Sequence, residues 1–356
     1  MPVTKCLLVM GIFVSRPGNA CEGSGRLSFF DEKIMAYGIL QKNSDNISFY
    51  LTVRFDYNKT HTFNGRVMTE QDLLRRFLFE DLGIRGEWVK LTTSWHSAKQ
   101  HQQGPQNAQL QLGQALAAVV MLSATIKFNG SMILQAQGDG DFKALVAQST
   151  HDRKIRGLIR SNDHVPVGSL ETMFGQGRLV LTIEPDNAQP YQGIVPLQGQ
   201  NLAAALQTYF EHSEQLKTRL WLFANETNAV GLLLQELPAQ NNDKSDWERI
   251  EILADTVTEQ ELLALDCEDL LYRLFNEENV RVFDAEPVEF ECACSRSRIG
   301  RTLRALGNEE LEDILQEQGS IQITCEFCGE QYLFGRVDVE TLLSQDSLTH
   351  PSETLH

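Results

Sequence analysis

Two closely spaced cysteine pairs near the C-terminus constrain this chain more than any other feature. Cys292 and Cys294 are separated by one residue, Cys325 and Cys328 are separated by two, and thirty residues lie between the pairs. Four thiolates brought together form a closed tetrahedral site that suits zinc. Because no histidine lies between Cys292 and Cys328, the pattern predicts a metal site with four sulfur ligands.

The spacing within the first pair leaves two uses of such a site open. Structural zinc sites usually draw on pairs two to four residues apart, and a CxC pair is less common. Arg296, Arg298, Arg301 and Arg304 follow this pair, and nearby cations lower the pKa of a thiol. An oxidant could convert one cysteine to a sulfenic acid that its neighbour resolves to a disulfide, which would release zinc and unfold the module. The spacing favours a structural zinc site, with a redox switch as the second hypothesis.

The composition limits the classes of partner. With 356 residues, 42% of them hydrophobic, the chain is long enough for one large domain or two smaller ones. Its formal net charge of −17 argues against a nucleic-acid partner, because phosphate binding needs a basic surface. Seven cysteines, an odd number, do not suggest a secreted disulfide framework, so we expect a cytoplasmic protein.

Residues 1–67 form an N-terminal extension of unclear status. Lys5 precedes an apolar run, Cys6–Val14, in the manner of a signal peptide. The run has only nine residues, too few to span a membrane, and Gly18-Asn19-Ala20 is a poor cleavage site. We therefore interpret the segment as added or wrongly assigned, with the folded protein starting near Met68, and expect no membrane partner.

Residues 68–240 are predicted to form one α+β core domain with an antiparallel-type sheet. Thr69-Glu70-Gln71-Asp72 reads as a capping box ahead of a helix that runs to about Leu82. Gly138-Asp139-Gly140 is expected to be a hairpin turn, because it lacks the spacing of a phosphate-binding loop. The other expected elements are helices at 110–126 and 202–215, a polar loop at 96–107 and strands at 87–92, 132–137, 142–148, 154–160, 177–183, 191–197, 218–224 and 230–237.

Residues 241–290 are predicted to be an acidic helical linker. From Asn241 to Glu291 there are sixteen acidic residues against four basic ones, with helical periodicity and a second capping box, Thr258 with Glu261. One interpretation is a solvated acidic face on ordinary packed helices. The other is a metastable linker, because like charges one turn apart weaken helices that would then depend on docking against their neighbours.

The last unit, residues 291–346, is predicted to be a small zinc-binding domain followed by a tail, 347–356. A helix is expected over 295–306, and Asn308 should cap a second helix that Gly319 closes. Strands at 321–324 and 331–334 should form a hairpin whose turn holds Cys325 and Cys328. So few residues cannot build a stable hydrophobic core on their own, and a bound metal ion would supply the missing folding free energy.

The other candidate residues are weaker. Cys267 lies among leucines and is expected to be a buried small side chain, and His151, His164 and His212 are scattered. The chain has no GxSxG, HExxH or P-loop motif, so we expect no enzyme. A thiol oxidoreductase using Cys325 and Cys328 is a minor alternative, because no thioredoxin-like pattern surrounds the pair.

At its cysteines the chain resembles the heat-shock protein 33 family of redox-regulated bacterial holdase chaperones. The similarity lies in the order CxC, about thirty residues, then CxxC, and in the flanking text ECACSRSRIGRTLRALG and GSIQITCEFCGEQYLF. Stretches of the first domain also match: LLRRFLFEDLGIRGEWVKL, LSATIKFNG, LQAQGDG and SEQLKTRLWL. The resemblance extends from about Met68 to Asp346 and does not include residues 1–67.

This resemblance implies a specific function. The reduced protein would bind one zinc ion through Cys292, Cys294, Cys325 and Cys328 and be inactive. Oxidation would form Cys292–Cys294 and Cys325–Cys328 disulfides and release the zinc. The zinc module and the linker would then lose structure, and a homodimer would hold unfolded or oxidatively damaged client proteins without ATP. The alternative is a binding module whose four-cysteine zinc site is purely structural.

Overall fold

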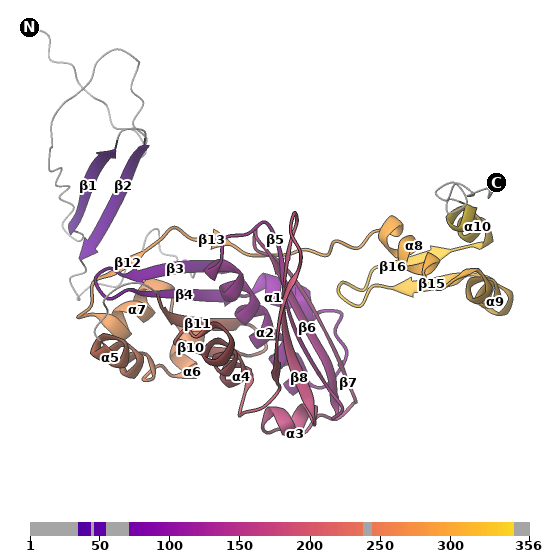
Figure 1. The fold of residues 1–356 in the computed structure, drawn as a ribbon, viewed down its shortest axis with the longest axis horizontal. Helices are drawn as coiled ribbons and strands as arrows, with labels where there is room; N and C mark the ends of the chain where they lie inside the picture. Colours follow the sequence, from indigo (N-terminus) through magenta and orange to yellow (C-terminus); the bar gives the residue numbers. More distant parts are fainter. Residues whose placement is uncertain (1–34, 44–45, 55–70, 238–243, 345–356) are drawn as a thin grey trace, which may run out of the picture. The chain divides into compact units, whose positions relative to one another are not determined.

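The computed structural model describes residues 35–43, 46–54, 71–237 and 244–344 (Figure 1). The chain divides into two compact units, Met1–Val67 and Met68–His356. In the first unit, β1 (Met35–Asn43) and β2 (Asn46–Arg54) form an antiparallel hairpin. The signal-like run and the predicted cap residues Thr69 and Glu70 lie outside the described residues.

The second unit contains two six-stranded sheets, and the first of them has the order β10-β11-β4-β3-β12, with β13 also paired to β3. All of its pairings are antiparallel. Its strands are β3 (Leu73–Phe79), β4 (Ile84–Leu91), β10 (Thr218–Ala224), β11 (Ala229–Glu236), β12 (Val280–Val282) and β13 (Glu286–Pro287). The predicted linker therefore supplies strands β12 and β13 to a sheet of the core.

The second sheet has the order β14-β7-β6-β5-β8-β9. It is antiparallel except at its edge, where β14 pairs parallel with β7. Its strands are β5 (Gly130–Gly138), β6 (Phe142–Thr150), β7 (Lys154–Ser161), β8 (Gly177–Pro185), β9 (Tyr191–Pro196) and β14 (Glu289–Phe290). The five strands β5 to β9 agree with the period-two segments of the sequence, and the α+β class with antiparallel sheets is confirmed.

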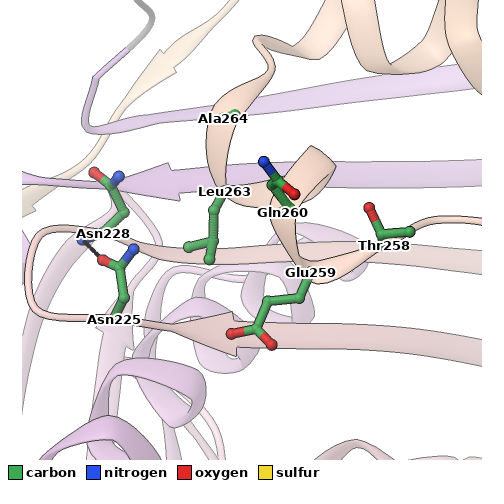
Figure 2. A pocket seen from close by; sticks show the side chains of 7 residues that line it. All are labelled: Asn225, Asn228, Thr258, Glu259, Gln260, Leu263 and Ala264. Atoms are coloured by element: carbon green, nitrogen blue, oxygen red, sulfur yellow. Dashed lines mark hydrogen bonds between the residues drawn. The ribbon is translucent and has the colours of Figure 1, made fainter.

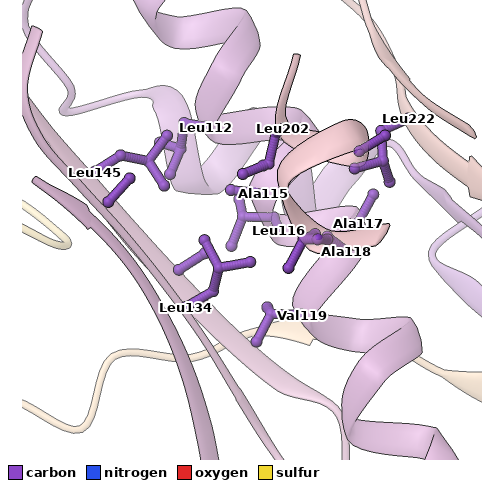
Figure 3. Packing of buried hydrophobic residues seen from close by; sticks show 14 of the residues in the cluster. Leu112, Ala115, Leu116, Ala117, Ala118, Val119, Leu134, Leu145, Leu202 and Leu222 are labelled. Carbon is purple, nitrogen blue, oxygen red and sulfur yellow. The ribbon is translucent and has the colours of Figure 1, made fainter. Parts of the chain in front are cut away.

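Helix α2 (Gln106–Thr125) contacts strands of both sheets and forms the centre of the main core (Figure 1). Figure 3 shows its leucines and alanines packed against Leu134 of β5, Leu145 of β6 and Leu222 of β10. Among the helices that the structure describes, α2 is the one long and apolar enough to cross a membrane, and 67% of that stretch is buried inside the protein. Its apolar character is therefore explained by its place in the core.

The predicted helix over residues 68–82 is wrong, because Leu73–Phe79 is strand β3. Its side chains alternate between two covered faces: Leu74 belongs to the α2 core, whereas Phe77 and Phe79 belong to a cluster with the linker helices. A strand covered on both faces carries apolar residues at neighbouring positions. The sequence of β3 therefore does not alternate between apolar and polar residues, and its apolar spacing resembles that of a helix.

Asp72 does cap a helix, but not the predicted one. Its carboxylate accepts hydrogen bonds from the backbone N–H groups of Thr92, Thr93 and Ser94, each at 2.9 Å. These residues open α1 (Thr93–Lys99), which occupies part of the segment expected to be a loop. Burial raises the pKa of the Asp72 carboxyl, but hydrogen bonds from the hydroxyls and backbone N–H groups of Ser94 and Thr92 outweigh burial, and the net pKa is lowered.

The linker helices pack on the other face of the first sheet. They are α5 (Lys244–Ala254), α6 (Glu259–Ala264) and α7 (Cys267–Phe275), and their apolar side chains join those of β3, β4 and β11 in a second buried cluster. The Thr258–Glu261 capping box is present, as predicted. Glu248, Glu259 and Glu268 lie exposed on the outer side, so the helices are packed and their acidic face is solvated.

Two other helical segments differ from their predictions in detail. The helix expected over residues 202–215 is α4 (Leu202–Tyr209), which Asn201 caps, followed by a π-helical turn, Phe210–Glu214. The short helix α3 (Leu170–Phe174), capped by Ser169, lies in a segment that had no predicted element. Helix α4 packs against β9 and β10 and adds Leu202 and Leu206 to the main core.

The C-terminal module has its own small core. It consists of α8 (Arg296–Arg304), α9 (Asn308–Gln318), β15 (Ile321–Thr324), β16 (Gln331–Phe334) and α10 (Arg336–Ser344), of which α10 was not predicted. Six side chains are fully buried in it: Leu303, Leu311, Leu315, Ile321, Phe334 and Val339. The predicted Asn308 cap is wrong, because Gly307, at φ 95°, occupies the N-cap position and Asn308 is the first helical residue.

Candidate metal centre

Four thiols, those of Cys292, Cys294, Cys325 and Cys328, come together in the C-terminal module. Their sulfur atoms all lie within 4.8 Å of one another. Cys292 Sγ lies 3.7 Å from Cys325 Sγ, and Cys294 Sγ lies 3.4 Å from Cys328 Sγ. Cys325 is buried and the other three are partly exposed. The two pairs, distant in sequence, therefore meet in one cluster with limited access to solvent.

A tight turn between β15 and β16 positions the second pair. The Cys325 N–H donates to the Glu330 carbonyl at 2.8 Å, and the Gly329 N–H donates to the Cys325 carbonyl at 2.8 Å. Gly329 adopts φ 73°, a left-handed conformation that glycine accepts without strain. The turn thereby holds Cys325 and Cys328 close together at the end of the hairpin.

The first pair lies in the extended segment that leads from β14 into α8. Ser295 directly follows it and caps α8, its hydroxyl accepting a hydrogen bond from the Arg298 N–H at 3.3 Å. Arg298 also donates through its guanidinium to the carbonyl of Ala293, between the two cysteines, at 3.1 Å. Both bonds fix the backbone around Cys292 and Cys294 relative to α8.

The donor set fits a single four-coordinate metal ion. A tetrahedral ion with sulfur ligands at about 2.3 Å separates its ligands by about 3.8 Å. The Cys292–Cys325 and Cys294–Cys328 sulfur separations, 3.7 and 3.4 Å, and the 4.8 Å upper limit on all S···S distances lie around that value. In the described part of the chain the cluster consists of cysteines alone, and four thiolates suit a soft or borderline ion.

The thiols differ in their acidity. Burial raises the pKa of the Cys292 and Cys328 thiols. Burial also raises the pKa of the Cys294 thiol, but hydrogen bonds outweigh it, and the net pKa is lowered. The leading hydrogen bond comes from Tyr332, whose hydroxyl donates to Cys294 Sγ at 3.2 Å. Of these three thiols, Cys294 loses its proton most readily.

The sequence pattern predicts that the arginines after the first pair lower the thiol pKa, whereas in the structure Tyr332 lowers that of Cys294. Two of those arginines have other partners: Arg296 pairs with Asp338 at 2.9 Å and lies over the ring of Phe334, and Arg298 binds the Ala293 carbonyl. The sequence does not predict the contact between Tyr332 and Cys294, because this contact depends on the pairing of β15 with β16. Tyr332 lies four residues after Cys328 on β16, opposite Ile323, and only the pairing of the two strands reveals its approach to Cys294.

We predict that replacing Tyr332 by phenylalanine weakens metal binding. The change deletes one hydroxyl and keeps the ring, so it removes the hydrogen bond that stabilises the Cys294 thiolate. Loss of such an outer partner costs about tenfold or more in metal affinity. Competition with a chromophoric chelator measures the affinity, and Tyr191→Phe, a hydroxyl deletion in the core domain, is the control. Equal affinities for wild type and Tyr332→Phe would contradict the prediction.

The weaker sequence candidates lie apart from this cluster. Cys267 is fully buried among the linker helices, as predicted. His151 Nδ1 lies 3.3 Å from the Gly130 N–H, and His212 Nδ1 lies 2.9 Å from the Thr208 carbonyl. His164 is exposed in a loop. The structure does not bring these three histidines together.

The turn that carries Cys325 and Cys328 also contacts the core. The Glu326 carboxylate accepts two hydrogen bonds from Arg160, at 2.6 and 3.1 Å, and its backbone carbonyl accepts one from Gln102 at 2.8 Å. The Arg156 guanidinium lies 4.5 Å from the centre of the Phe327 ring. The two residues between the cysteines are therefore contact residues, and the turn is tied to β7 and to the segment after α1.

A separate open hollow lies where linker helix α6 meets the turn between β10 and β11 (Figure 2). Asn225 and Asn228 border it from the turn, and Glu259, Gln260 and Leu263 border it from α6. Asn225 uses its side-chain oxygen within the turn, accepting from the Asn228 N–H at 2.7 Å. The hollow lies at the contact between the linker and the first sheet, and the residues that line it do not form a cluster of metal ligands.

Comparison with known proteins decides the family. A family model described as Hsp33 protein matches residues 72–335, most of this chain, and includes all four clustered cysteines. The chain belongs to the Hsp33 family. The match begins at Asp72, so the family's sequence pattern covers the core sheets, the linker helices and the thiol cluster, and leaves the first unit outside.

Individual Hsp33 relatives agree over the same region. The 33 kDa chaperonin of Nitrosococcus oceani is 57% identical over 289 residues, which are 81% of this chain and 100% of that protein. That of Methylobacillus flagellatus is 42% identical over 293 residues, again 81% of this chain and 100% of the relative. The crystal structure of the 33 kDa chaperonin from Thermotoga maritima has the same fold, with a TM-score of 0.69 at 23% identity, covering 78% of this chain and 99% of that one.

Proposed function

We propose that this Hsp33 family member is a redox-regulated, ATP-independent holdase that keeps unfolding and oxidatively damaged proteins from aggregating. Its close relatives are 33 kDa chaperonins, which supports a chaperone rather than an enzyme. The redox part of the proposal rests on one observation, the four converging thiols. We expect it to act in the cytoplasm on unfolded client proteins, without a nucleic-acid or membrane partner.

In the reduced state, Cys292, Cys294, Cys325 and Cys328 would hold one zinc ion. Bound zinc would keep these thiols deprotonated and would add to the folding free energy of a module with a small core. The sulfur with the lowered pKa, that of Cys294, is the expected first nucleophile. The oxidant we name is a peroxide, which supplies two oxidising equivalents for each disulfide.

The oxidation balances in two steps. A thiolate sulfur attacks one peroxide oxygen, the O–O bond breaks, and the products are a sulfenic acid and, after protonation, one water molecule. A second thiol then attacks the sulfenic sulfur, forms the S–S bond and displaces a second water molecule. Two such reactions consume two peroxide molecules and four thiols, after which the sulfurs no longer serve as metal ligands.

The proposed disulfides are Cys292–Cys294 and Cys325–Cys328, although close S···S contacts also run across the pairs, from Cys292 to Cys325 and from Cys294 to Cys328. This pairing is the one that the resemblance to the Hsp33 family implies, and the two possible pairings differ in their effect on the module. Crossed bonds would tie residues 292–294 to the hairpin turn and staple the module. Bonds within each pair leave the thirty residues between the pairs without a cross-link, so the module can unfold.

We also propose a role for each segment of the chain. Residues 1–67 are an extension, 68–240 the core chaperone domain, 241–290 the metastable linker, 291–346 the redox-switch zinc domain and 347–356 a tail. When the zinc domain unfolds, we propose that the linker strands that precede it in the chain detach from the sheets, and that the linker helices then release the apolar face of the first sheet, which includes Phe77, Phe79 and Trp88. We propose that this surface contributes to client binding and that the oxidised protein is a homodimer.

Light scattering of a heat-aggregating client tests this function. The reduced, zinc-loaded protein should give little protection, and the peroxide-treated protein should suppress scattering at equimolar concentration. Zinc release and free thiols are counted on the same samples, and peptide mapping identifies the disulfides. Equal protection by both forms, with zinc retained and thiols unchanged, would instead support the alternative of a purely structural zinc site.

A further inference from the structure

The segment between α7 and the thiol cluster is a strap that spans both sheets. We define the strap as residues 280–291, which end directly before Cys292. Its strands β12 and β13 pair with β3 of the first sheet, and β14 pairs with β7 of the second. Four strap amides, those of Phe283, Val288, Glu289 and Glu291, donate to the carbonyls of Arg76, Asp72, Arg153 and Ile155, at 2.8 to 3.1 Å. Docking of the strap therefore links the thiol cluster to the core.

Glu286 is the charged anchor of the strap. Its carboxylate lies 2.6 Å from Arg76 of β3 and 3.1 Å from Arg153, which lies between β6 and β7. The Arg153 side chain is 10% exposed and also donates to the Ser123 hydroxyl of α2 at 3.1 Å. One strap carboxylate thus joins arginines from both sheets, in an ion pair that is nearly buried at Arg153 and open to solvent at Arg76, whose side chain is 46% exposed.

A second carboxylate lies beneath this anchor. Glu87 of β4 is 2% exposed, and β-sheet register places it opposite Arg76. Within the described part of the chain its Oε2 has no hydrogen-bond partner. The charged groups that act on it are Arg85, Arg76 and Arg153, which favour its ionised form, and Glu286, which opposes it. Arg85 is already engaged with Gln235 and with the Thr125 carbonyl.

We propose that Glu87 and Glu286 compete for Arg76 and Arg153, so that docking of the strap is coupled to the binding of a proton by Glu87. When the strap is docked, Arg76 and Arg153 pair with Glu286. Protonation of Glu87 then removes the repulsion between the Glu87 and Glu286 carboxylates. With the strap released, Glu286 is gone, and Glu87 can ionise beside the arginines. Docking of the strap can be measured on the reduced protein, without an oxidant and without a client protein. Its effect on chaperone activity rests on the proposed function.

The direction of the pH effect follows from the two states. In the docked state burial raises the pKa of Glu87 to about 7, from an ordinary value of 4.5. Because the docked state prefers the protonated form, docking is strongest below the ordinary value and weakens as pH rises through about 7. For a single proton the docking equilibrium changes by up to about tenfold per pH unit across that interval.

Hydrogen exchange of the strap amides measures the docking directly. The experiment uses the reduced, zinc-loaded full chain between pH 5.5 and 8, with exchange rates corrected for the intrinsic pH dependence by an unstructured peptide. We expect the protection of Phe283, Val288, Glu289 and Glu291 to fall about tenfold or more over this range. Amides of β10 and β11 report on the integrity of the core and should not follow the same curve. Flat protection of the strap would overturn the proposal.

Three variants separate the coupling from general destabilisation. Glu87→Gln, which mimics the protonated side chain, should keep the strap docked and abolish its pH dependence. Glu286→Gln should lower strap protection and move its midpoint to lower pH, because Glu87 then has the arginines to itself. The matched control is Glu289→Gln on the same strap, where the side chain is 63% exposed and pairs with Lys154. Should Glu87→Gln fail to fold, equal midpoints for Glu286→Gln and Glu289→Gln would still refute the coupling.

Discussion

Replacing Cys292 and Cys294 together by serine should abolish zinc binding and unfold the C-terminal module. The change removes two of four converging sulfurs, and the remaining pair cannot close a tetrahedral site. Structural zinc contributes about 10 kcal/mol or more to the folding of such modules, far more than a core of six buried side chains can replace. Zinc content by elemental analysis and hydrogen exchange of residues 296–344 measure the result.

The same variant should lose its response to oxidant. Without the first pair, peroxide cannot switch the protein between two states, so client protection should be equal before and after treatment. Cys267→Ala is the matched control, because it also removes a thiol but one buried in the linker cluster and outside the four. A serine variant that still binds zinc and is still activated by peroxide would contradict the assignment of these residues.

Truncating Phe275 to alanine should activate the reduced protein. Phe275 of α7 packs its ring edge-on against Phe79 of β3, with ring centres 5.0 Å apart, and is almost fully buried. Removing such a side chain costs about 3–5 kcal/mol through lost burial and the cavity left behind. That loss falls on the linker's docking to the sheet, so the linker should open without oxidant and expose the apolar face.

Light scattering with the reduced, zinc-loaded variant measures this effect. Ile252→Ala is the control, because Ile252 lies on linker helix α5 but is 68% exposed. We expect Phe275→Ala to suppress client aggregation under reducing conditions with zinc still bound, and Ile252→Ala to behave as wild type. If Phe275→Ala keeps its zinc and shows no activity before oxidation, release of the linker is not the step that exposes the client-binding surface.

The two variants act at opposite ends of one chain of contacts. The thiol cluster lies directly after the strap, the strap is paired with both sheets, and the linker helices before it cover the first sheet. Replacement of Cys292 and Cys294 should destabilise the C-terminal module, which follows the strap. Phe275→Ala should weaken the packing of the linker helices on the first sheet, before the strap. Agreement between their effects on client protection would show that the linker transmits the state of the thiols to the surface that clients bind.

Local sequence patterns predicted much of the fold. Strands β5 to β11, helix α2, the Thr258–Glu261 capping box and the hairpin of the C-terminal module lie where hydrophobic period and turn residues indicate. Two of the failures have a common cause. β3 is covered on both faces and so lacks a period of two, and Asp72 caps α1 across twenty residues of sequence instead of a helix of its own. In both cases distant segments decide the local structure.

The sequence by itself determined the class of fold, the two cysteine pairs and the acidic character of residues 241–291, because spacing, period and charge are properties of neighbouring residues. Only the tertiary structure decided what surrounds them. It brought Tyr332 to Cys294, placed the linker helices over the second face of the first sheet and set Glu286 between arginines of two sheets above the buried Glu87. Such contacts join residues far apart in the chain, and their energies depend on burial and distance, which only the folded state defines.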